Sequence, residues 1–272
     1  MTRATTPRPP YTPAQTTPAY QLRYTWSGWP SRGAQFPPEP DAAFFESLGE
    51  RWDADDGFRL LERWWTPDEV HLLTSARPDV APQSIAGRTK GRLQHALRQR
   101  GTPTSFSRSF CLKSIGEATR ESVEAYIDAQ VAEEQFADPR FEETMSAFTT
   151  ENPGVDLSEP VTTNHGRYYY GLHVVLVVAE RYRIGSTDEL GRLRDLSTAV
   201  ASKKGHRLSR LSVMPDHLHL AVGAEPDQSP RQVALAYMNN LAYGLDTPAL
   251  WQSSYYVGTF GEYDMGALRQ NL

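Results

Sequence analysis

The chain has 272 residues, of which 39% are hydrophobic and 22% charged, with one cysteine and a formal net charge of −5 at pH 7. This length can bury the core of one large domain or of two modest ones. The single cysteine, Cys111, excludes a disulfide framework and a cysteine-based zinc site. No apolar run reaches the roughly 18 residues of a membrane span, and residues 1–20 lack an apolar signal-peptide core. We therefore expect a cytoplasmic protein without a membrane partner.

Charge is distributed unevenly along the chain. Residues 117–160 hold twelve acids and two bases, and the rest of the chain holds 26 bases against 21 acids. Residues 81–116 contain seven Lys or Arg and no acid. Such a one-sided segment is typical of a surface that contacts nucleic-acid phosphates, and equally of a solvated helix face. The negative net charge therefore does not exclude a nucleic-acid partner.

The chain divides into a tail, a first unit, a linker and a second unit. Residues 1–18 are rich in Thr and Pro and are predicted to be disordered. The first unit, residues 19–135, is predicted to contain strands over 20–26, 59–65 and 106–113 and helices over 39–48, 84–100 and 117–135.

Residues 136–165 contain the string ENPGVDLSEP and are predicted to form the linker. In the second unit, residues 166–272, we expect strands over 168–179, 208–213, 218–222 and 255–260 and helices over 188–205, 230–245 and 264–272.

The two units repeat each other. Residues 65–72 align with 213–220 at an offset of 148, and residues 106–110 align with 251–255 at an offset of 145. At the second offset, Gly116 falls on Gly261. A drift of only three positions between two matching segments indicates a tandem duplication. The sequence therefore predicts an α+β protein made of two copies of one domain, each a small sheet flanked by helices.

His217 and His219 lie on either side of Leu218 in a predicted strand. Alternate side chains of a strand share a face, so both imidazoles point the same way. Two neutral imidazoles supply half of a divalent-metal site, and Asp216 would orient one ring. A lone His-x-His is more often a surface pair than a metal site, so its context decides. His173, within the apolar strand over 168–179, is most simply a strand histidine.

The surrounding strings resemble a known family. MPDHLHL at 214–220 lies between GLHVVLVVAERYR at 171–183 and LWQSSYYVGTFG at 250–261. This arrangement is similar to the single-tyrosine transposases of single-stranded insertion sequences in the HUH superfamily, including the transposase A-like and REP-associated members. The resemblance covers residues 168–272 strongly and 20–130 more faintly, and it implies two ferredoxin-like HUH domains.

In that family one tyrosine attacks DNA, and a glutamine four residues later completes the metal site. The second unit departs from this pattern, because the tyrosine position is Asn271 and the chain ends one residue later. The first unit keeps the string Tyr-Ile-x-x-Gln as Tyr126 and Gln130, but its histidine pair is Glu69 and His71. Each unit therefore keeps the half of the motif that the other lacks.

Family members work as dimers in which one protomer's tyrosine helix docks beside the other's histidines. The resemblance therefore implies a single-chain pseudo-dimer, monomeric in solution, with one composite site. In it Tyr126 is the nucleophile, and His217, His219 and Gln130 bind Mg²⁺ or Mn²⁺ with Asp216 as an orienting partner. Such a cation would activate attack by a phenol, whose ordinary pKa is about 10. The other site, with Glu69, His71 and Asn271, is predicted to be degenerate.

The implied partner is single-stranded DNA carrying hairpins. Basic residues of both units are the candidates for phosphate contacts: Lys90, Arg92, Arg98, Arg100, Arg108, Lys113, Lys203, Lys204, Arg207 and Arg210. The acids of residues 117–160, which include the Tyr126 helix, are expected to face solvent or to mask basic surface until substrate binds.

Three functions are compatible with these residues. The first is a metal-dependent endonuclease and strand transferase that acts through a 5′-phosphotyrosine intermediate, in transposition or in a domesticated host role. The second is a domesticated, catalytically inactive DNA-binding protein derived from a transposase. The third is a replication-initiator or terminal-protein-like nickase that uses the same chemistry. We expect the first, because random decay of both copies would rarely spare one complete set of residues.

Overall fold

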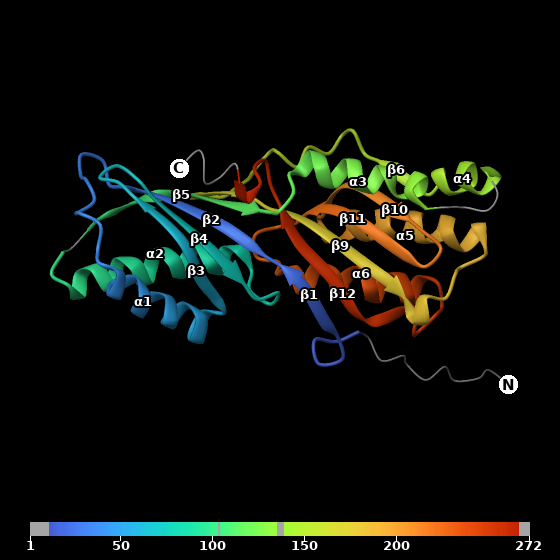
Figure 1. Ribbon diagram of the computed structural model, residues 1–272, viewed down its shortest axis with the longest axis horizontal. Helices are drawn as coiled ribbons and strands as arrows, with labels where there is room; N and C mark the ends of the chain where they lie inside the picture. The colour runs from blue at the N-terminus through green and yellow to red at the C-terminus, as the bar shows by residue number, and fades with distance from the viewer. Residues whose placement is uncertain (1–10, 103, 135–138, 267–272) are drawn as a thin grey trace.

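The computed structural model describes residues 11–102, 104–134 and 139–266. In this part of the chain the strands form two six-stranded sheets that lie end to end, with helices packed against each sheet (Figure 1). The sheet at the left of the figure belongs mainly to the first unit and the sheet at the right mainly to the second. The α+β class expected from the sequence is confirmed.

The first sheet has the strand order β3-β4-β2-β5-β8-β7. Its first four strands come from the first unit: β2 (Arg23–Pro30), β3 (Phe58–Trp65), β4 (Val70–Ala76) and β5 (Phe106–Ile115). The helices α1 (Ala42–Arg51) and α2 (Pro82–Gln99) pack against this sheet. A π-helical turn, Trp52–Asp56, follows α1 directly. Helix α2 begins with a proline, whose fixed φ angle suits the first turn of a helix.

The second sheet has the order β1-β12-β9-β11-β10-β6. Its central strands come from the second unit: β9 (Gly171–Val178), β10 (Arg207–Val213), β11 (His217–Gly223) and β12 (Trp251–Phe260). The helices α5 (Thr187–Lys204) and α6 (Pro230–Gly244) pack against it. Helix α6 starts at a capping box formed by Ser229 and Gln232, which satisfies backbone N–H groups of the first turn.

The duplication is visible in the strand order. The strand order β10-β11-β9-β12 in the second sheet corresponds, strand for strand, to the order β3-β4-β2-β5 in the first. The offset of 148 places β2 on β9, and the offset of 145 places β5 on β12. Both offsets are those of the sequence repeat, so each sheet is built around one copy of the same unit.

The two copies exchange a strand. β1 (Thr17–Gln21) precedes the first unit but pairs in parallel with β12, so that Pro18 lies beside Tyr255. β8 (Gly166–Tyr169) precedes the second unit but pairs in parallel with β5, so that Gly166 lies beside Phe110. The offset of 148 places Pro18 on Gly166, and the offset of 145 places Phe110 on Tyr255, so the two strand pairs are equivalent. Each unit therefore completes the sheet of its neighbour, under an approximate twofold symmetry.

The same symmetry governs the contact between the sheets. Ser114 Oγ donates to the carbonyl of Phe260 at 2.5 Å, and the equivalent Thr259 Oγ1 donates to the carbonyl of Ile115 at 2.7 Å. A Cβ atom on Gly116 would lie 2.5 Å from the carbonyl oxygen of Thr259, and one on Gly261 would lie 2.2 Å from that of Ser114. Only glycine permits this approach of the two backbones.

The structure differs from the sequence prediction in several segments, and the predicted strand over 20–26 is divided between β1 and β2, which lie in different sheets. Residues 11–18, expected to be disordered, are placed: Tyr11 Oη accepts from the backbone N–H of Trp251 at 2.7 Å, and the strand β1 follows. The predicted strand over 168–179 is two strands in different sheets, which separate at the buried Tyr170. A strand at β4, which we did not predict, completes a hairpin with β3.

The segment predicted as a linker, residues 136–165, contains further elements among its described residues. They are α4 (Pro139–Ser146), β6 (Thr149–Glu151) and β7 (Val161–Thr162). The strand β6 extends the second sheet beside β10, and β7 pairs with β8 at the edge of the first. The segment thus adds an edge strand to each sheet. None of the described helices is long and apolar enough to cross a membrane.

Candidate active site between the two units

The histidine pair lies on a central strand of the second sheet. His217 and His219 begin β11, which is paired on both sides, with β10 and β9. The Nδ1 atom of His217 lies 2.7 Å from Oδ1 of Asp216, whose other oxygen is 3.3 Å from Arg181. Burial raises the pKa of the Asp216 carboxyl, but its hydrogen bonds and charges from His217 and Arg181 outweigh this effect and leave the pKa below its ordinary value. Asp216 is therefore an ionised acceptor for one imidazole.

The second imidazole contacts a third histidine. Nδ1 of His219 lies 3.0 Å from Nε2 of His173, which comes from the neighbouring strand β9, and the two rings are nearly parallel, with centroids 5.2 Å apart. Burial, with the nearby charges of His173 and His217, lowers the pKa of His219 to about 2. Burial lowers the pKa of His173 to about 4. Both rings are therefore neutral at neutral pH, which is the form that binds metal.

The tyrosine helix of the first unit docks on this sheet. α3 (Arg120–Glu133) begins at Thr119, whose side chain caps the helix by accepting from Ser122 N–H. Its buried residues Val123 and Ile127 form an apolar cluster with residues of the second sheet and its preceding segment, namely Leu157, Ala221 and Phe260. The helix of one unit therefore packs against the strands of the other, as Figure 1 shows for α3 beside β10 and β11.

This docking brings the two half-motifs together. Tyr126 and Gln130 are four residues apart on α3 and share a face. Oε1 of Gln130 lies 3.4 Å from Nε2 of His217. The Tyr126 ring stands edge-on to the His219 ring, with centroids 5.5 Å apart, and to the His173 ring at 6.0 Å. Gln130 is buried, whereas Tyr126 is 43% exposed, so its side chain is open to a substrate.

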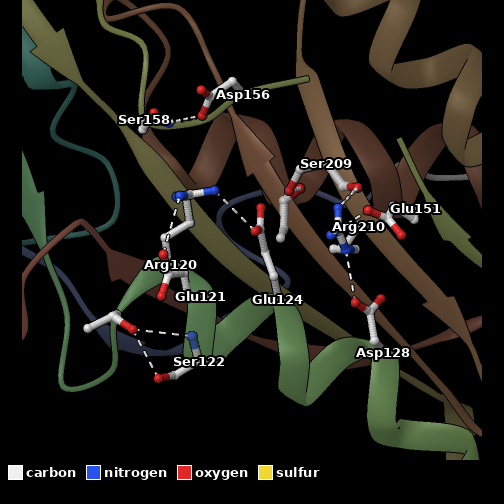
Figure 2. Close-up of polar contacts among 12 residues, drawn as sticks. Arg120, Glu121, Ser122, Glu124, Asp128, Glu151, Asp156, Ser158, Ser209 and Arg210 are labelled. Atoms are coloured by element: carbon white, nitrogen blue, oxygen red, sulfur yellow. Dashed lines mark hydrogen bonds and ion pairs between the residues drawn. The ribbon is translucent and has the colours of Figure 1, made fainter. Parts of the chain in front are cut away.

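An arginine of the second unit forms an ion pair with α3 at a residue between Tyr126 and Gln130. Arg210, on β10, lies 3.0 Å from Asp128 of α3 and 2.9 Å from Glu151 of β6 (Figure 2). A second tie joins Arg183 to Glu134, just beyond the end of α3, at 3.0 Å. These acids belong to the acidic segment, and they pair with cations of the second unit.

The donor atoms fit a divalent cation. When His217 is neutral with its proton on Nδ1, directed to Asp216, its Nε2 carries a lone pair that faces the amide oxygen of Gln130. A cation between these two acceptors would satisfy both. Adjacent ligands of an octahedral cation at about 2.1 Å lie about 3 Å apart, close to the observed 3.4 Å. The described residues hold no cluster of three His, Cys, Asp or Glu side chains arranged for a metal.

The corresponding face of the first sheet lacks this arrangement. Nδ1 of His71 lies 2.8 Å from Ser27 Oγ, and Nε2 of His71 lies 3.3 Å from a carboxylate oxygen of Glu69. The position equivalent to His173 is Thr25. Asn271 lies outside the described residues. On this face a carboxylate and a serine occupy the two sides of the remaining imidazole.

Most of the predicted phosphate-contacting residues of the first unit have intrachain partners. Lys90 Nζ donates to the carbonyl of Ser107 at 2.6 Å, and burial lowers the pKa of this amine. Arg92 pairs with Asp55 at 3.2 Å and with Asp56, and Arg100 pairs with Asp41 at 2.6 Å. The Lys113 amine lies 5.0 Å from the centre of the Tyr169 ring. Arg98 and Arg108 are exposed.

Of the predicted phosphate-contacting residues of the second unit, two have intrachain partners and two are exposed. Arg207 donates to the carbonyl of Glu159 at 2.8 Å, and its pKa is lowered by burial. Arg210 forms the tie to α3 described above. Lys203 and Lys204 are exposed in the last turn of α5, where a positive charge also stabilises the helix end. Exposed positive charge is therefore left at Arg98, Arg108, Lys203 and Lys204 among the predicted set.

Sequence reasoning missed one residue of the site. His173 was interpreted as an ordinary strand histidine, yet it contacts His219, and its ring lies 5.8 Å from that of Tyr256. The offset of 148 offered no signal for His173, because its counterpart is Thr25. Its position on the strand next to β11 is the only indication, and it requires the pairing of β9 with β11.

Two separate stretches of the chain match one protein family. Residues 31–130 and 167–270 both match the family model "Transposase IS200 like", and together they make up more than half of the chain. The protein belongs to this IS200-like transposase family. The two separate matches also confirm the tandem duplication.

Single relatives match only one copy. Over 118 residues the transposase is 30% identical to the ISDra2 transposase TnpA of Deinococcus radiodurans. This match covers 38% of this chain and 84% of that relative. A crystal structure of a candidate transposase from Deinococcus radiodurans R1 matches 41% of this chain and 95% of its own, with 24% identity and a TM-score of 0.35. One part of the transposase thus suffices to cover most of the ISDra2 relative.

Proposed function

We propose that this transposase cleaves and rejoins single-stranded DNA at one composite active site, made of Tyr126 and Gln130 from the first unit and His217 and His219 from the second. The substrate is DNA that carries hairpins. The active form is one chain, which acts as an internal pseudo-dimer in the cytoplasm. The observation that supports the proposal is the contact of Gln130 with His217 at 3.4 Å, with Tyr126 beside His219.

The chemistry is transfer of a phosphoryl group to tyrosine. Tyr126 Oη forms a bond to the phosphorus, and the bond from phosphorus to the 3′ oxygen of the preceding nucleotide breaks. The phenol loses its proton and the departing 3′ oxygen takes one up, which leaves a 5′-phosphotyrosine and a free 3′-OH. Attack of a 3′-OH on this linkage reverses the step and joins strands without an external energy source.

The residues around Tyr126 have distinct tasks. His217, His219 and Gln130 would hold Mg²⁺ or Mn²⁺, which when bound supplies positive charge for the scissile phosphate and for the charge that develops on its oxygens. Asp216 keeps the lone pair of His217 directed to the site. The exposed Tyr126 side chain is reached from solvent, so an extended strand can approach it without opening of the core.

The proposal is tested with purified protein, Mn²⁺ and hairpin-bearing single-stranded DNA from the flanks of its own gene. A denaturing gel detects a covalent protein–DNA adduct, and peptide mapping locates it. We expect an adduct on Tyr126 that is absent from Tyr126→Phe and His217→Ala. Tyr263→Phe is the matched control, because Tyr263 is similarly exposed, at 40%, and lies outside the site. Tight hairpin binding without any adduct would favour the inactive DNA-binding protein instead.

A further inference from the structure

The ring nitrogens of the two proposed metal-binding histidines have different partners. Nδ1 of His217 is directed to a carboxylate, Asp216, which can only accept from it. Nδ1 of His219 is directed to another imidazole, through Nε2 of His173 at 3.0 Å. An imidazole nitrogen accepts or donates according to its tautomer. The tautomers of His219 and His173 are therefore coupled.

Only one of the two arrangements leaves His219 able to bind a cation. If His173 donates, the proton of His219 lies on Nε2, and neither of its nitrogens is free. If His219 donates through Nδ1–H, the lone pair of Nε2 is free, and His173 Nε2 is the acceptor. Metal-binding histidines generally donate their second N–H to an acceptor of this kind, which fixes the ring and its tautomer.

We propose that His173 is a positioning residue that holds His219 as the Nδ1–H tautomer and so presents its Nε2 lone pair to the metal site. This inference rests on the composite site of the proposed function. His173 is held in place, since β9 pairs with both β11 and β12, and its ring plane lies within 20° of that of His219, which suits a hydrogen bond between the two ring nitrogens. The ring of Tyr126 contacts the imidazoles of both His173 and His219, so His173 also lies beside the proposed nucleophile.

The first sheet supports the assignment by contrast. There the histidine equivalent to His219 is His71, and threonine replaces His173. Nδ1 of His71 is directed to the hydroxyl of Ser27 at 2.8 Å, and a hydroxyl accepts or donates equally well. The imidazole acceptor is thus missing from the copy in which glutamate has also replaced the first histidine. Both changes remove parts of the same metal-binding arrangement.

The test compares two variants of the full chain. His173→Phe keeps an aromatic ring but has no acceptor, and His173→Gln places an amide oxygen near the position of Nε2. Long-range ¹H–¹⁵N correlation of the imidazoles, with His219 assigned from a His219→Gln sample, gives the tautomer in metal-free protein. Calorimetry gives the Mn²⁺ affinity, and His95→Phe, which alters an exposed histidine on α2, is the control.

We expect the Nδ1–H tautomer of His219 in the unmodified chain and its loss in His173→Phe. Mn²⁺ affinity should fall by roughly 10- to 100-fold in His173→Phe and by much less in His173→Gln. An Nε2–H tautomer in the unmodified chain, or an unchanged Mn²⁺ affinity in His173→Phe, would overturn the inference. If the tautomer is as expected but the unmodified chain binds no Mn²⁺, the positioning role stands and the metal-dependent reaction is wrong. The unmodified and His173→Gln proteins give this answer even if His173→Phe does not fold.

Discussion

The amide oxygen of Gln130 lies 3.4 Å from Nε2 of His217, although 87 positions separate the two residues. The first belongs to the helix that ends one unit, and the second to a central strand of the other. The catalytic tyrosine proposed here lies one helical turn before Gln130. A single chain therefore brings all four residues of the proposed composite site together. This arrangement allows a direct test of whether one molecule is sufficient for cleavage.

We expect that inactive variants will not rescue each other. In a two-chain site, a mixture of Tyr126→Phe with His217→Ala would assemble one intact site from two damaged molecules. In the arrangement observed, every molecule of the mixture keeps its own defect, so adduct formation stays at background. The measurement is adduct yield on a denaturing gel, with each variant mixed with unmodified protein as the control. Restored activity in the mixture of variants would show that the tyrosine helix docks between chains.

Charge reversal at Arg210 tests how α3 is held. Arg210→Asp places a carboxylate beside Asp128 and Glu151 and should weaken docking of the helix, which lowers the adduct yield. Because Asp128 is partly exposed, the pair itself contributes at most about 1 kcal/mol, roughly a fivefold effect. Asp128→Arg combined with Arg210→Asp should recover part of the yield, since the attraction is restored with opposite signs.

The matched control for this pair is Arg63→Asp. Arg63 forms a comparable ion pair with Glu39 at 2.8 Å, remote from α3, so its reversal should leave the adduct yield unchanged. Equal losses in Arg63→Asp and Arg210→Asp would mean that the effect is one of general stability. No recovery in the double variant would leave Arg210 without a role specific to Asp128.

The glycines between the sheets should not tolerate a side chain. Gly261→Ala would place Cβ 2.2 Å from the carbonyl oxygen of Ser114, and the backbones would have to separate. We expect a loss of about 1–3 kcal/mol in the free energy of unfolding. Gly87→Ala is a control of opposite sign, because Gly87 lies on the exposed side of α2 with nothing within 4 Å. Alanine there should stabilise the helix by about 0.5–1 kcal/mol, and urea unfolding measures both changes.

Tyr11 should contribute to stability although it follows a Thr/Pro-rich segment. Its hydroxyl accepts from the N–H of Trp251 and donates to the carbonyl of the same residue, at 2.7 and 3.0 Å. Tyr11→Phe leaves both groups of the buried Trp251 without this partner, and such losses cost about 1–3 kcal/mol. Tyr243→Phe, at a residue that is 84% exposed, should change the unfolding midpoint little. Equal midpoints for the two variants would contradict an ordered role for Tyr11.

The sequence was sufficient where the two copies carry information about each other. The offsets of 148 and 145 predicted the duplicated sheets, and the survival of Tyr126 with Gln130 in one copy and His217 with His219 in the other predicted which residues meet. The first prediction came from comparing two versions of the same unit, whereas the second also needed the resemblance to a family whose members assemble the site between two protomers.

The parts that could not be predicted depend on pairing across long distances. Residues 17 and 18 end the Thr/Pro-rich segment that was expected to be disordered, and the strand that begins there pairs with the open edge of β12. His173 lies in an apolar segment like any other, and its role depends on which strand lies next to it. Arg92 and Arg100 belong to one basic cluster of the sequence and Arg210 to another, but each meets an acid supplied by a distant segment.

The strand exchange sets an order of events during synthesis. β1 is made first, yet its partner β12 lies near the other end of the chain. β5 likewise has no partner on one of its edges until β8 has been made. Domains that fold as they leave the ribosome usually complete one core before the next begins. Here the first sheet lacks β7 and β8 until residues 161–169 have emerged, and the second lacks β12 until residues 251–260 have emerged. A chain truncated before residue 161 would therefore leave β1 without a partner and β5 as an open edge, the feature that most favours aggregation.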